Sequence, residues 1–133
     1  MLEAININSS RRIEMINITP VIETSVKKSG IKNGICFLHI PHTTAALTIN
    51  ENADPDVPYD IIKKIERLIP KQDNYTHSEG NSDAHIKSSF FGPTINLMID
   101  NGKIILGLWQ CVYFCEFDGP RSRKLFIKII KEI

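Results

Sequence analysis

An excess of charge of either sign is missing from this sequence. Sixteen lysine and arginine residues balance fifteen aspartate and glutamate residues, which leaves a formal net charge of +1. A chain so nearly neutral has no general attraction for a phosphate backbone or for anionic lipid. We therefore expect no binding to nucleic acid and none to a membrane.

Long apolar runs and abundant cysteine are missing as well. No stretch approaches the roughly 20 residues needed to span a bilayer. The first residues, Met1-Leu2-Glu3-Ala4, lack the basic stretch and apolar core of a signal peptide. The three thiols, at Cys36, Cys111 and Cys115, form no regular disulfide framework. These absences predict a cytoplasmic protein with reduced, buried cysteines.

The length favours one domain. A chain of 133 residues is close to the commonest domain size and is long enough to bury one core. No linker, internal repeat or low-complexity tract divides it. We expect a single domain over residues 1–133.

Hydrophobic periodicity predicts the elements of that domain. Strands are expected over 3–8, 13–18, 35–40, 45–50, 94–99, 103–117 and 123–131. Helices are expected from Thr19-Pro20 to Gly30, over 58–69, and for two turns over 84–91. The helices fall between runs of strands without strict alternation. This order predicts an α+β fold with a largely antiparallel sheet or sandwich.

Residues 103–117 form the most apolar stretch and are expected to make one long strand, bent near Gly107. Apolar side chains fall on both of its faces, and Trp109 is expected in the core. A sheet in a small α+β domain usually leaves one face wet. We therefore expect a neighbouring subunit to cover part of this sheet.

Four histidines are candidate site residues. His42, His77 and His85 lie beside polar, turn-rich sequence, whereas His39 lies within an apolar strand and is expected to be structural. Three imidazoles brought together would suit zinc or a related divalent ion. Their spacings of 35 and 8 residues match no local metal motif. Unrelated surface histidines therefore stay open as an alternative.

Two acids and a basic turn add further candidates. Glu51 ends a strand, where a structural role and a site role are equally compatible with the sequence. In a regular strand, Gln110 and Glu116 share one face but lie about 20 Å apart. We therefore do not expect them to contact one small ligand within one subunit. Arg121 and Arg123 form a turn that can bind phosphate in a bidentate manner, or an ordinary solvated loop.

Three blocks of the sequence resemble the signatures of the YjbQ family, also called UPF0047. The first block comprises His42-Thr43-Thr44-Ala45, Ile49-Asn50-Glu51-Asn52-Ala53-Asp54-Pro55 and Asp60. The second comprises His77, Gly80, His85-Ile86-Lys87 and Gly92. The third comprises Gly107, Trp109-Gln110, Glu116 and Asp118-Gly119-Pro120-Arg121-Ser122-Arg123. The blocks follow the family's order across nearly the whole chain.

The resemblance implies an α+β homotrimer with a polar cleft where the histidine-bearing segments meet. It also implies an association with secondary thiamine-phosphate synthase activity. By position, His42, His77 and His85 are the candidate ligands of a divalent metal, zinc or magnesium. The candidate catalytic residues are Glu116, Glu51 and Gln110. The candidate substrate- or anion-binding residues are Asn50, Asp54, Lys87, Arg121 and Arg123.

On this basis we expect a metal-assisted enzyme that acts on a small phosphorylated metabolite. Glu116 would serve as a metal ligand or as a general base. The alternative is a non-catalytic protein that binds a phosphorylated metabolite or another anion, and no nucleophile motif contradicts it. A purely structural role is the third possibility.

Overall fold

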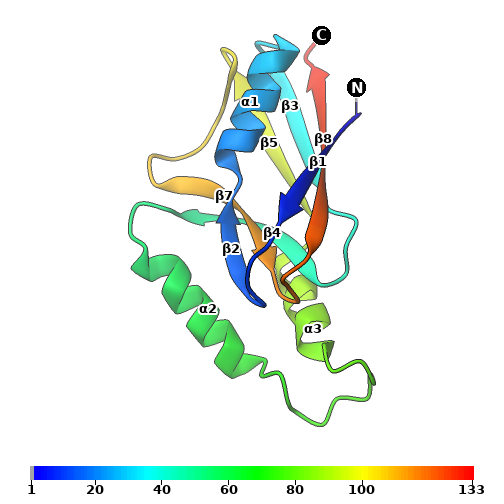
Figure 1. The fold of residues 1–133 in the computed structure, drawn as a ribbon. Coiled ribbons are helices and arrows are strands. Elements are labelled where there is room, and N and C mark those ends of the chain that lie inside the picture. The colour runs from blue at the N-terminus through cyan, green and yellow to red at the C-terminus, as the bar shows by residue number, and fades with distance from the viewer. Residues whose placement is uncertain (1) are drawn as a thin grey trace.

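The computed structural model describes residues 2–133, which form two antiparallel sheets and three helices (Figure 1). In chain order the elements are β1 (Leu2–Asn8), β2 (Glu14–Asn17), α1 (Thr19–Ser29), β3 (Gly34–His39), β4 (Ala45–Glu51), α2 (Asp56–Leu68), α3 (Ser82–Phe91), β5 (Thr94–Asp100), β6 (Lys103–Ile104), β7 (Gln110–Glu116) and β8 (Ser122–Lys131). The predicted α+β class with antiparallel pairing is confirmed. Within residues 2–133, no helix has the length and apolar character needed to cross a membrane.

The two sheets pack against each other around the main core. The larger sheet has the strand order β1-β8-β3-β5-β6, and the smaller has the order β2-β7-β4. Buried side chains of β3, β5 and β8 form one cluster with those of β4 and β7. Helix α1 adds Ile22 and Val26 to the same cluster. The larger sheet therefore buries one face against both the smaller sheet and α1.

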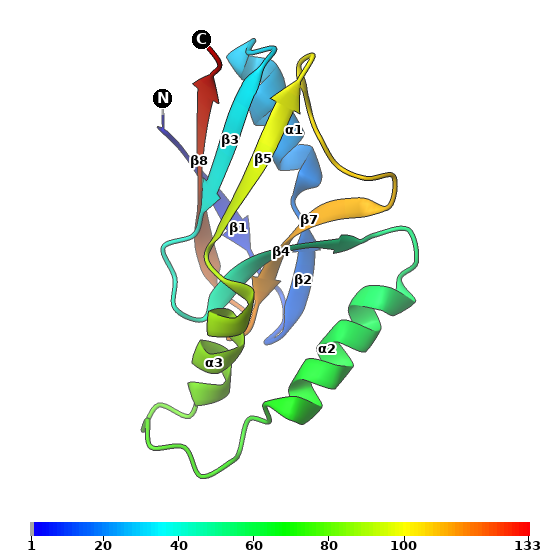
Figure 2. The same cartoon turned by 180° about the vertical axis from the view of Figure 1, so that it is seen from behind.

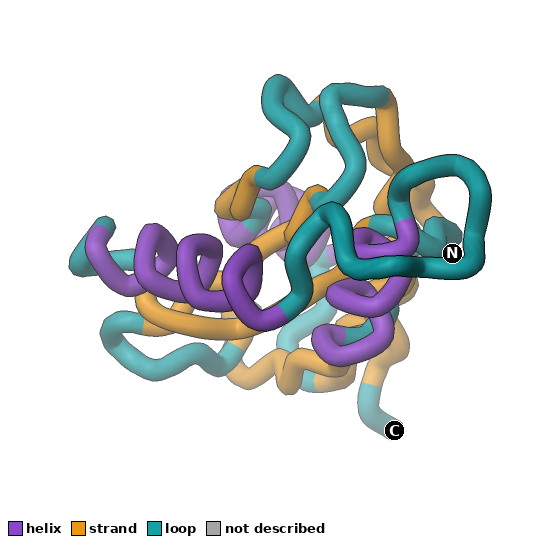
Figure 3. Tube along the Cα trace, turned by 90° about the horizontal axis from the view of Figure 1, so that it is seen from below, coloured by secondary structure: helices purple, strands orange, loops and turns teal. Residues whose placement is uncertain are grey.

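Strand β7, at the centre of the smaller sheet, is buried on both faces. Along β7, Cys111, Tyr113 and Cys115 point away from the main core and form a second cluster with Ala46 and with Ala84 of α3. Helices α2 and α3 lie on this side of the sheet, and the view from below in Figure 3 shows helices and the connecting loop nearest the viewer. Because both faces are covered, β7 lacks the polar alternation of a half-exposed strand.

The expected single strand over 103–117 is wrong. Strand β6 ends at Ile104 in the larger sheet, and β7 begins at Gln110 in the smaller one, so residues 105–109 cross between the sheets. Within this crossing the Gly107 N–H donates to Oε1 of Gln110 at 2.7 Å and closes a turn. Trp109, expected in the core, is 63% exposed, and Leu108 is 93% exposed. The apolar character of this loop cannot be explained by burial within its own chain.

Local turn and helix signals are confirmed where the backbone requires them. Asn101 and Gly102 have φ angles of 50° and 79°, as a two-residue hairpin turn between β5 and β6 requires. Gly30 ends α1 with a left-handed φ of 69°. Helix α2 begins at Asp56, two residues before the predicted start, and α3 begins at Ser82 instead of Ala84.

The outer face of the larger sheet is apolar and open to solvent. Ile35, Phe37, Met98 and Ile130 are exposed on it and line a groove of about 810 Å³. Figure 2 shows β3, β5 and β8 from this side, with α1 behind them. The expected structural setting of His39 is wrong, because His39 is exposed at the end of β3. An apolar patch this extended commonly marks an interaction surface.

Candidate functional site

Three segments that are distant in the sequence meet at one cavity of about 400 Å³. They are the turn between β3 and β4, the end of the α2–α3 loop with the start of α3, and the turn between β7 and β8. The lining residues are Pro41, His42, Thr43, Thr44, His77, Glu79, Asn81, His85, Asp118, Arg121 and Arg123. The structure thus brings together His42, His77, His85, Arg121 and Arg123 in one space, which we call the histidine cavity. The sequence nominated all of these residues.

A buried ion pair forms the floor of this cavity. Arg123 is 3% exposed and Glu116 is fully buried. The Nε of Arg123 donates to Oε1 of Glu116 at 2.9 Å, and its Nη2 donates to Oε2 of the same carboxylate. Nη2 also donates to the Thr44 hydroxyl at 2.8 Å and to the Thr44 carbonyl at 3.1 Å. The guanidinium is therefore held in one orientation.

The Glu116 carboxylate is a positioning group in this arrangement. Burial alone raises its pKa, but hydrogen bonds from Arg123, the Ser9 hydroxyl and the Asp118 N–H outweigh burial and hold the pKa below its usual range. A general base needs an acceptor that is free to take a proton. Both oxygens of Glu116 are already engaged within the chain, so the expected role as base or metal ligand is not supported by this geometry.

His42 is half-buried and fixed by the backbone. Its Nε2 accepts a hydrogen bond from the Lys124 N–H at 2.8 Å. Burial, and after it the positive charge of Arg123, lower the pKa of His42. The neutral ring with an accepting Nε2 carries its proton on Nδ1. His42 therefore offers one N–H donor without adding a positive charge.

Arg121 forms the outer side of the cavity and is half exposed. Its Nη2 donates to Oδ2 of Asp118 and its Nε donates to the Asp118 carbonyl, both at 2.9 Å. Nδ2 of Asn81 donates to the same Asp118 oxygen at 2.8 Å. The amide oxygen of Asn81 is buried and accepts no hydrogen bond from residues 2–133. A ligand with a donor group, or a cation, would satisfy this oxygen.

The other two histidines form a pair. The rings of His77 and His85 meet edge to face, with centroids 5.3 Å apart. Nε2 of His77 lies 4.0 Å from Oε1 of Glu79. Among residues 2–133, no group of three or more histidine, cysteine, aspartate or glutamate side chains is arranged to hold a metal ion. A metal in this cavity would therefore need ligands from other groups.

Lys87 lies outside the cavity, in a separate charged cluster. It is fully buried, and its Nζ donates to Oδ2 of Asp83 at 2.8 Å and to Oε1 of Glu66. Arg12 donates to the same Asp83 oxygen at 2.6 Å. This cluster joins α2 to α3. Both acids already compensate the Lys87 charge, so Lys87 is not placed to bind a substrate anion.

Four other nominated residues lie at the opposite end of β4 and β7. Glu51 pairs with Gln110 across these strands. The side-chain oxygen of Asn50 accepts from the Glu51 N–H at 2.7 Å, and Oδ1 of Asp54 accepts from the Asp56 N–H at 2.9 Å. Gln110 and Glu116 occupy the two ends of β7, as strand geometry predicts. Asn50, Glu51, Asp54 and Gln110 are therefore not part of the histidine cavity.

Several residues that shape the cavity had not been nominated. Ser9 donates to Glu116 at 2.7 Å across 107 positions of sequence, and Thr44 fixes Arg123 across 79. Ser9 lies in the turn between β1 and β2, and no local pattern marks it. Thr44 and Asp118 stand within the blocks that resemble the family, and that resemblance was the only signal for them. Asn81 had no signal.

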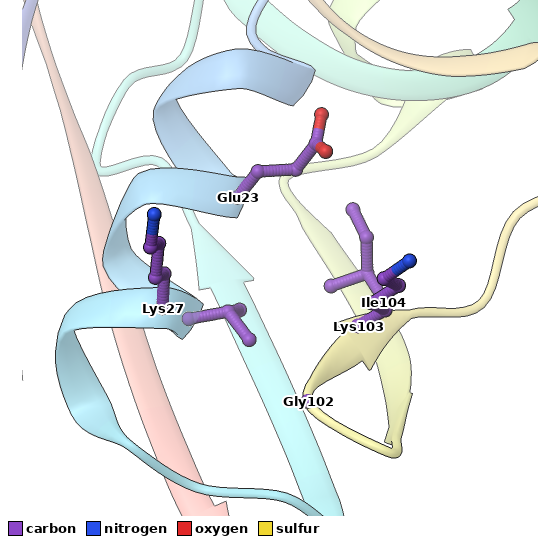
Figure 4. Close-up of a pocket in the computed structure, with 6 residues that line it drawn as sticks. Glu23, Lys27, Gly102, Lys103 and Ile104 are labelled. Carbon is purple, nitrogen blue, oxygen red and sulfur yellow. The ribbon is translucent and has the colours of Figure 1, made fainter.

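A second cavity, of about 350 Å³, lies between α1 and the hairpin of β5 and β6. Figure 4 shows Glu23 and Lys27 on α1 and Lys103 and Ile104 on β6 across from them. It contains no histidine or arginine, and its acid offsets part of the charge of its lysines. The histidine cavity is therefore the stronger candidate site.

Known proteins are similar to this chain in sequence and in fold. The family described as "UPF0047 protein YjbQ-like" matches residues 3–132. UPF0047 protein MJ1081 of Methanocaldococcus jannaschii is 52% identical over 130 residues, which cover 98% of this chain and 94% of that protein. UPF0047 protein YugU of Bacillus subtilis is 45% identical over 131 residues, which cover 98% and 99%.

Two solved structures agree with the fold. An uncharacterised conserved protein of the YjbQ/UPF0047 family from Clostridium acetobutylicum superposes with a TM-score of 0.94 at 48% identity, covering 96% of this chain and 99% of that one. A YbjQ-like protein of unknown function from Sulfolobus solfataricus superposes with a TM-score of 0.94 at 33% identity, covering 99% and 97%. The chain belongs to the YjbQ/UPF0047 family.

Proposed function

We propose that the histidine cavity binds the phosphate group of a small phosphorylated metabolite. This proposal rests on two guanidinium groups that line the cavity, those of Arg121 and Arg123. Each uses Nε and Nη2 for contacts within the chain, and neither Nη1 donates to any of residues 2–133. Planar guanidinium donors suit phosphate oxygens, and prior fixation reduces the entropy lost on binding.

We propose further that the protein is an enzyme that uses the imidazoles of His42, His77 and His85. The Nδ1–H of His42 would donate to a phosphate oxygen. A carboxylate in the place of His42 would instead repel the phosphate. His77 or His85 would exchange a proton with the bound substrate, because a neutral imidazole carries one donor and one acceptor nitrogen. The alternative is a protein that binds the same ligand through the same contacts but transfers no proton.

A panel of phosphorylated metabolites separates the two functions. The enzyme should release inorganic phosphate or pyrophosphate from at least one compound, with Mg²⁺ or Zn²⁺ supplied. Saturable thermal stabilisation without turnover across the panel would favour the binding protein. The thiamine-phosphate synthase activity implied by the resemblance stays a prediction. Formation of thiamine phosphate from its pyrimidine pyrophosphate and thiazole phosphate precursors would test it.

A divalent metal is a second element of the proposal. His77, His85 and the unpartnered amide oxygen of Asn81 line the same cavity, and these are nitrogen and oxygen donors of the kind that zinc or magnesium accepts. Magnesium in particular is commonly held partly by substrate phosphates. Phosphate oxygens and water would therefore complete the coordination of the metal.

Metal analysis tests this element. The protein purified without chelator should contain zinc or magnesium when phosphate is present, and the double variant His77→Ala/His85→Ala should lose most of it. Equal metal content in the two proteins would contradict the metal proposal. Equal metal content would not bear on phosphate binding, which isothermal titration tests separately.

Isothermal titration with inorganic phosphate tests the binding site itself. A charge-assisted hydrogen bond contributes about 1.5–3 kcal/mol, and Arg121 is half exposed, so Arg121→Ala should weaken binding about tenfold. Arg67, an exposed arginine on α2 that does not line the cavity, supplies the matched control. Equal affinities of Arg121→Ala, Arg67→Ala and the unaltered protein would overturn the proposal.

We also propose that the chain assembles as a homotrimer. The exposed face of the larger sheet and the loop with Leu108 and Trp109 leave apolar surface that a neighbouring copy would cover. Ile105 lines the groove on that face, so the loop and the groove are continuous. The number three comes from the family resemblance.

A further inference from the structure

Helix α2 is attached to the rest of the chain more weakly than α1 is. Helix α1 buries Ile22 and Val26 in the main core, whereas no residue of α2 is buried. The apolar residues Ile61, Ile62 and Ile65 of α2 are only half-buried. Most of the free energy that docks a helix comes from its buried apolar face. Helix α2 can therefore leave its position at a lower cost than α1.

Helix α2 and the loop after it form one outer segment, residues 54–80, which we call the arm; the rest of the chain is the body. Figures 1 and 2 show the arm running outside the two sheets, from just after β4 to the start of α3. Among residues 2–133, Glu66 is the one arm residue that forms a hydrogen bond or ion pair with the body. Its Oε1 accepts from Nζ of Lys87 and lies 3.8 Å from Nη1 of Arg12. The arm thus has a single polar attachment.

This attachment can break without leaving a buried charge unpaired. Nζ of Lys87 also donates to Oδ2 of Asp83 at 2.8 Å, and Arg12 donates to the same oxygen at 2.6 Å. The side chain of Glu66 is 38% exposed, so its carboxylate already reaches water. Removing one partner is costly when the other stays buried and alone. Here Lys87 keeps Asp83, so the separation of Glu66 from Lys87 is reversible.

The arm ends next to the histidine cavity, at a residue suited to be a hinge. Gly80 has a φ of 80°, and a Cβ there would meet nothing within 4 Å, so its backbone is not held by packing. His77 and Glu79 of the arm line the cavity, whereas Arg121 and Arg123 belong to the body. A movement of the arm therefore changes one side of the cavity and leaves the arginines in place.

We propose that the arm opens and closes the histidine cavity, and that the Glu66–Lys87 pair holds the closed form. This inference rests on the proposed function, because phosphate is the ligand that closure would retain. In the closed form, a phosphate on Arg121 and Arg123 also lies beside His77. In the open form it keeps only its contacts with the body. Phosphate therefore shifts the arm toward the closed form, and its release requires opening.

Hydrogen exchange on the assembled, full-length protein measures the opening. An isolated helix of 13 residues is marginally stable in water, so α2 loses its backbone hydrogen bonds when the arm leaves the body. In Glu66→Gln the α2 amides should exchange about tenfold faster, since the charge of the pair is lost. The amides of β7 should keep their rate. Glu23→Gln, which removes an exposed acid from α1, is the matched control and should change neither rate.

Inorganic phosphate at constant ionic strength tests the coupling to the cavity. Saturating phosphate should slow the exchange of α2 by about tenfold in the unaltered protein, since closure adds a contact to a charged ligand. In His77→Ala the effect of phosphate should be much smaller. Gln72→Ala, an exposed loop residue that does not line the cavity, should respond to phosphate as the unaltered protein does.

The outcomes separate this inference from the proposed function. If α2 and β7 exchange faster together in Glu66→Gln, or if neither changes, the pair does not hold a separate arm and the inference is wrong. If isothermal titration detects phosphate binding but the exchange of α2 does not slow, closure is wrong and the phosphate site stands. If phosphate does not bind, the proposed function fails, and the coupling of the arm to the ligand fails with it.

Discussion

Replacing Glu116 by glutamine changes the charge beneath the candidate site while nearly keeping the shape of the side chain. The carboxylate accepts from Nε of Arg123 at 2.9 Å, from Nη2 of the same residue, from the Ser9 hydroxyl at 2.7 Å and from the Asp118 N–H at 3.0 Å. In Glu116→Gln one acceptor oxygen becomes an amide donor that faces other donors. Arg123 is then left buried without its counter-charge.

The structure sets the size of the effect. Breaking a buried ion pair by removing one partner costs about 3–5 kcal/mol. Glutamine keeps one accepting oxygen, so the lower end of the range, about 3 kcal/mol, is expected. Unfolding entropy is about 2.1 cal/mol/K per residue. Over the 133 residues of the chain, the loss corresponds to a decrease in Tm of about 10 °C.

Urea denaturation at a fixed protein concentration measures this loss, because association also affects apparent stability. Glu23→Gln, an exposed acid on α1, is the matched control and should change the unfolding free energy by less than about 0.5 kcal/mol. The double variant with Arg123→Met should recover part of the loss, since the unpaired charge is gone. If Glu116→Gln is as stable as the control, the pair of Glu116 and Arg123 does not stabilise the fold, and Glu116 becomes a candidate general base again.

Three further predictions concern acid stability, packing and assembly. Glu116 and Asp83 both have a lower pKa in the folded protein than in the unfolded chain. The stabilisation that these two carboxylates provide is therefore present above about pH 4 and is lost as pH falls through their folded pKa values. Below about pH 4 the urea midpoint should fall less steeply with pH in Glu116→Gln than in the unaltered protein. A Cβ at Gly119 would lie 2.3 Å from the Arg11 carbonyl oxygen, so Gly119→Ala should destabilise by about 1–3 kcal/mol in thermal unfolding, whereas Gly107→Ala, which meets only the flexible Gln110 side chain at 3.3 Å, should not. Light scattering at micromolar concentration should give a mass three times the 15.1 kDa of one chain, and a mass near 15.1 kDa would rule out the trimer.

Local sequence signals predict the helices and turns well, because their causes are local. The 3.6-residue spacing of α2 and the Asn101-Gly102 turn depend on neighbouring residues alone. The error at 105–109 has a physical reason. Leu108 and Trp109 are apolar but exposed, and alternation of apolar residues cannot distinguish a buried strand from an apolar loop.

The candidate site could be predicted only in part. The convergence of His42, His77 and His85 followed from the family resemblance, since no local spacing links them. The partners of Glu116 and of Lys87 could not be read from sequence, because ion pairs such as Lys87 with Glu66 depend on how α2 packs beside α3. The sequence predicted that Glu116 and Lys87 act in the site. In the structure both side chains are buried and paired with groups of opposite charge.

A phosphate held by Arg121, Arg123 and the His42 Nδ1–H would lie in the cavity that His42, His77 and His85 line. The imidazole resonances of all four histidines can be followed by NMR at constant pH and ionic strength while inorganic phosphate is added. The resonances of His42, His77 and His85 should shift along one saturable curve, and that of His39, exposed outside the cavity, should not move. Unmoved resonances, or an equal unsaturable drift of all four, would contradict phosphate binding in this cavity.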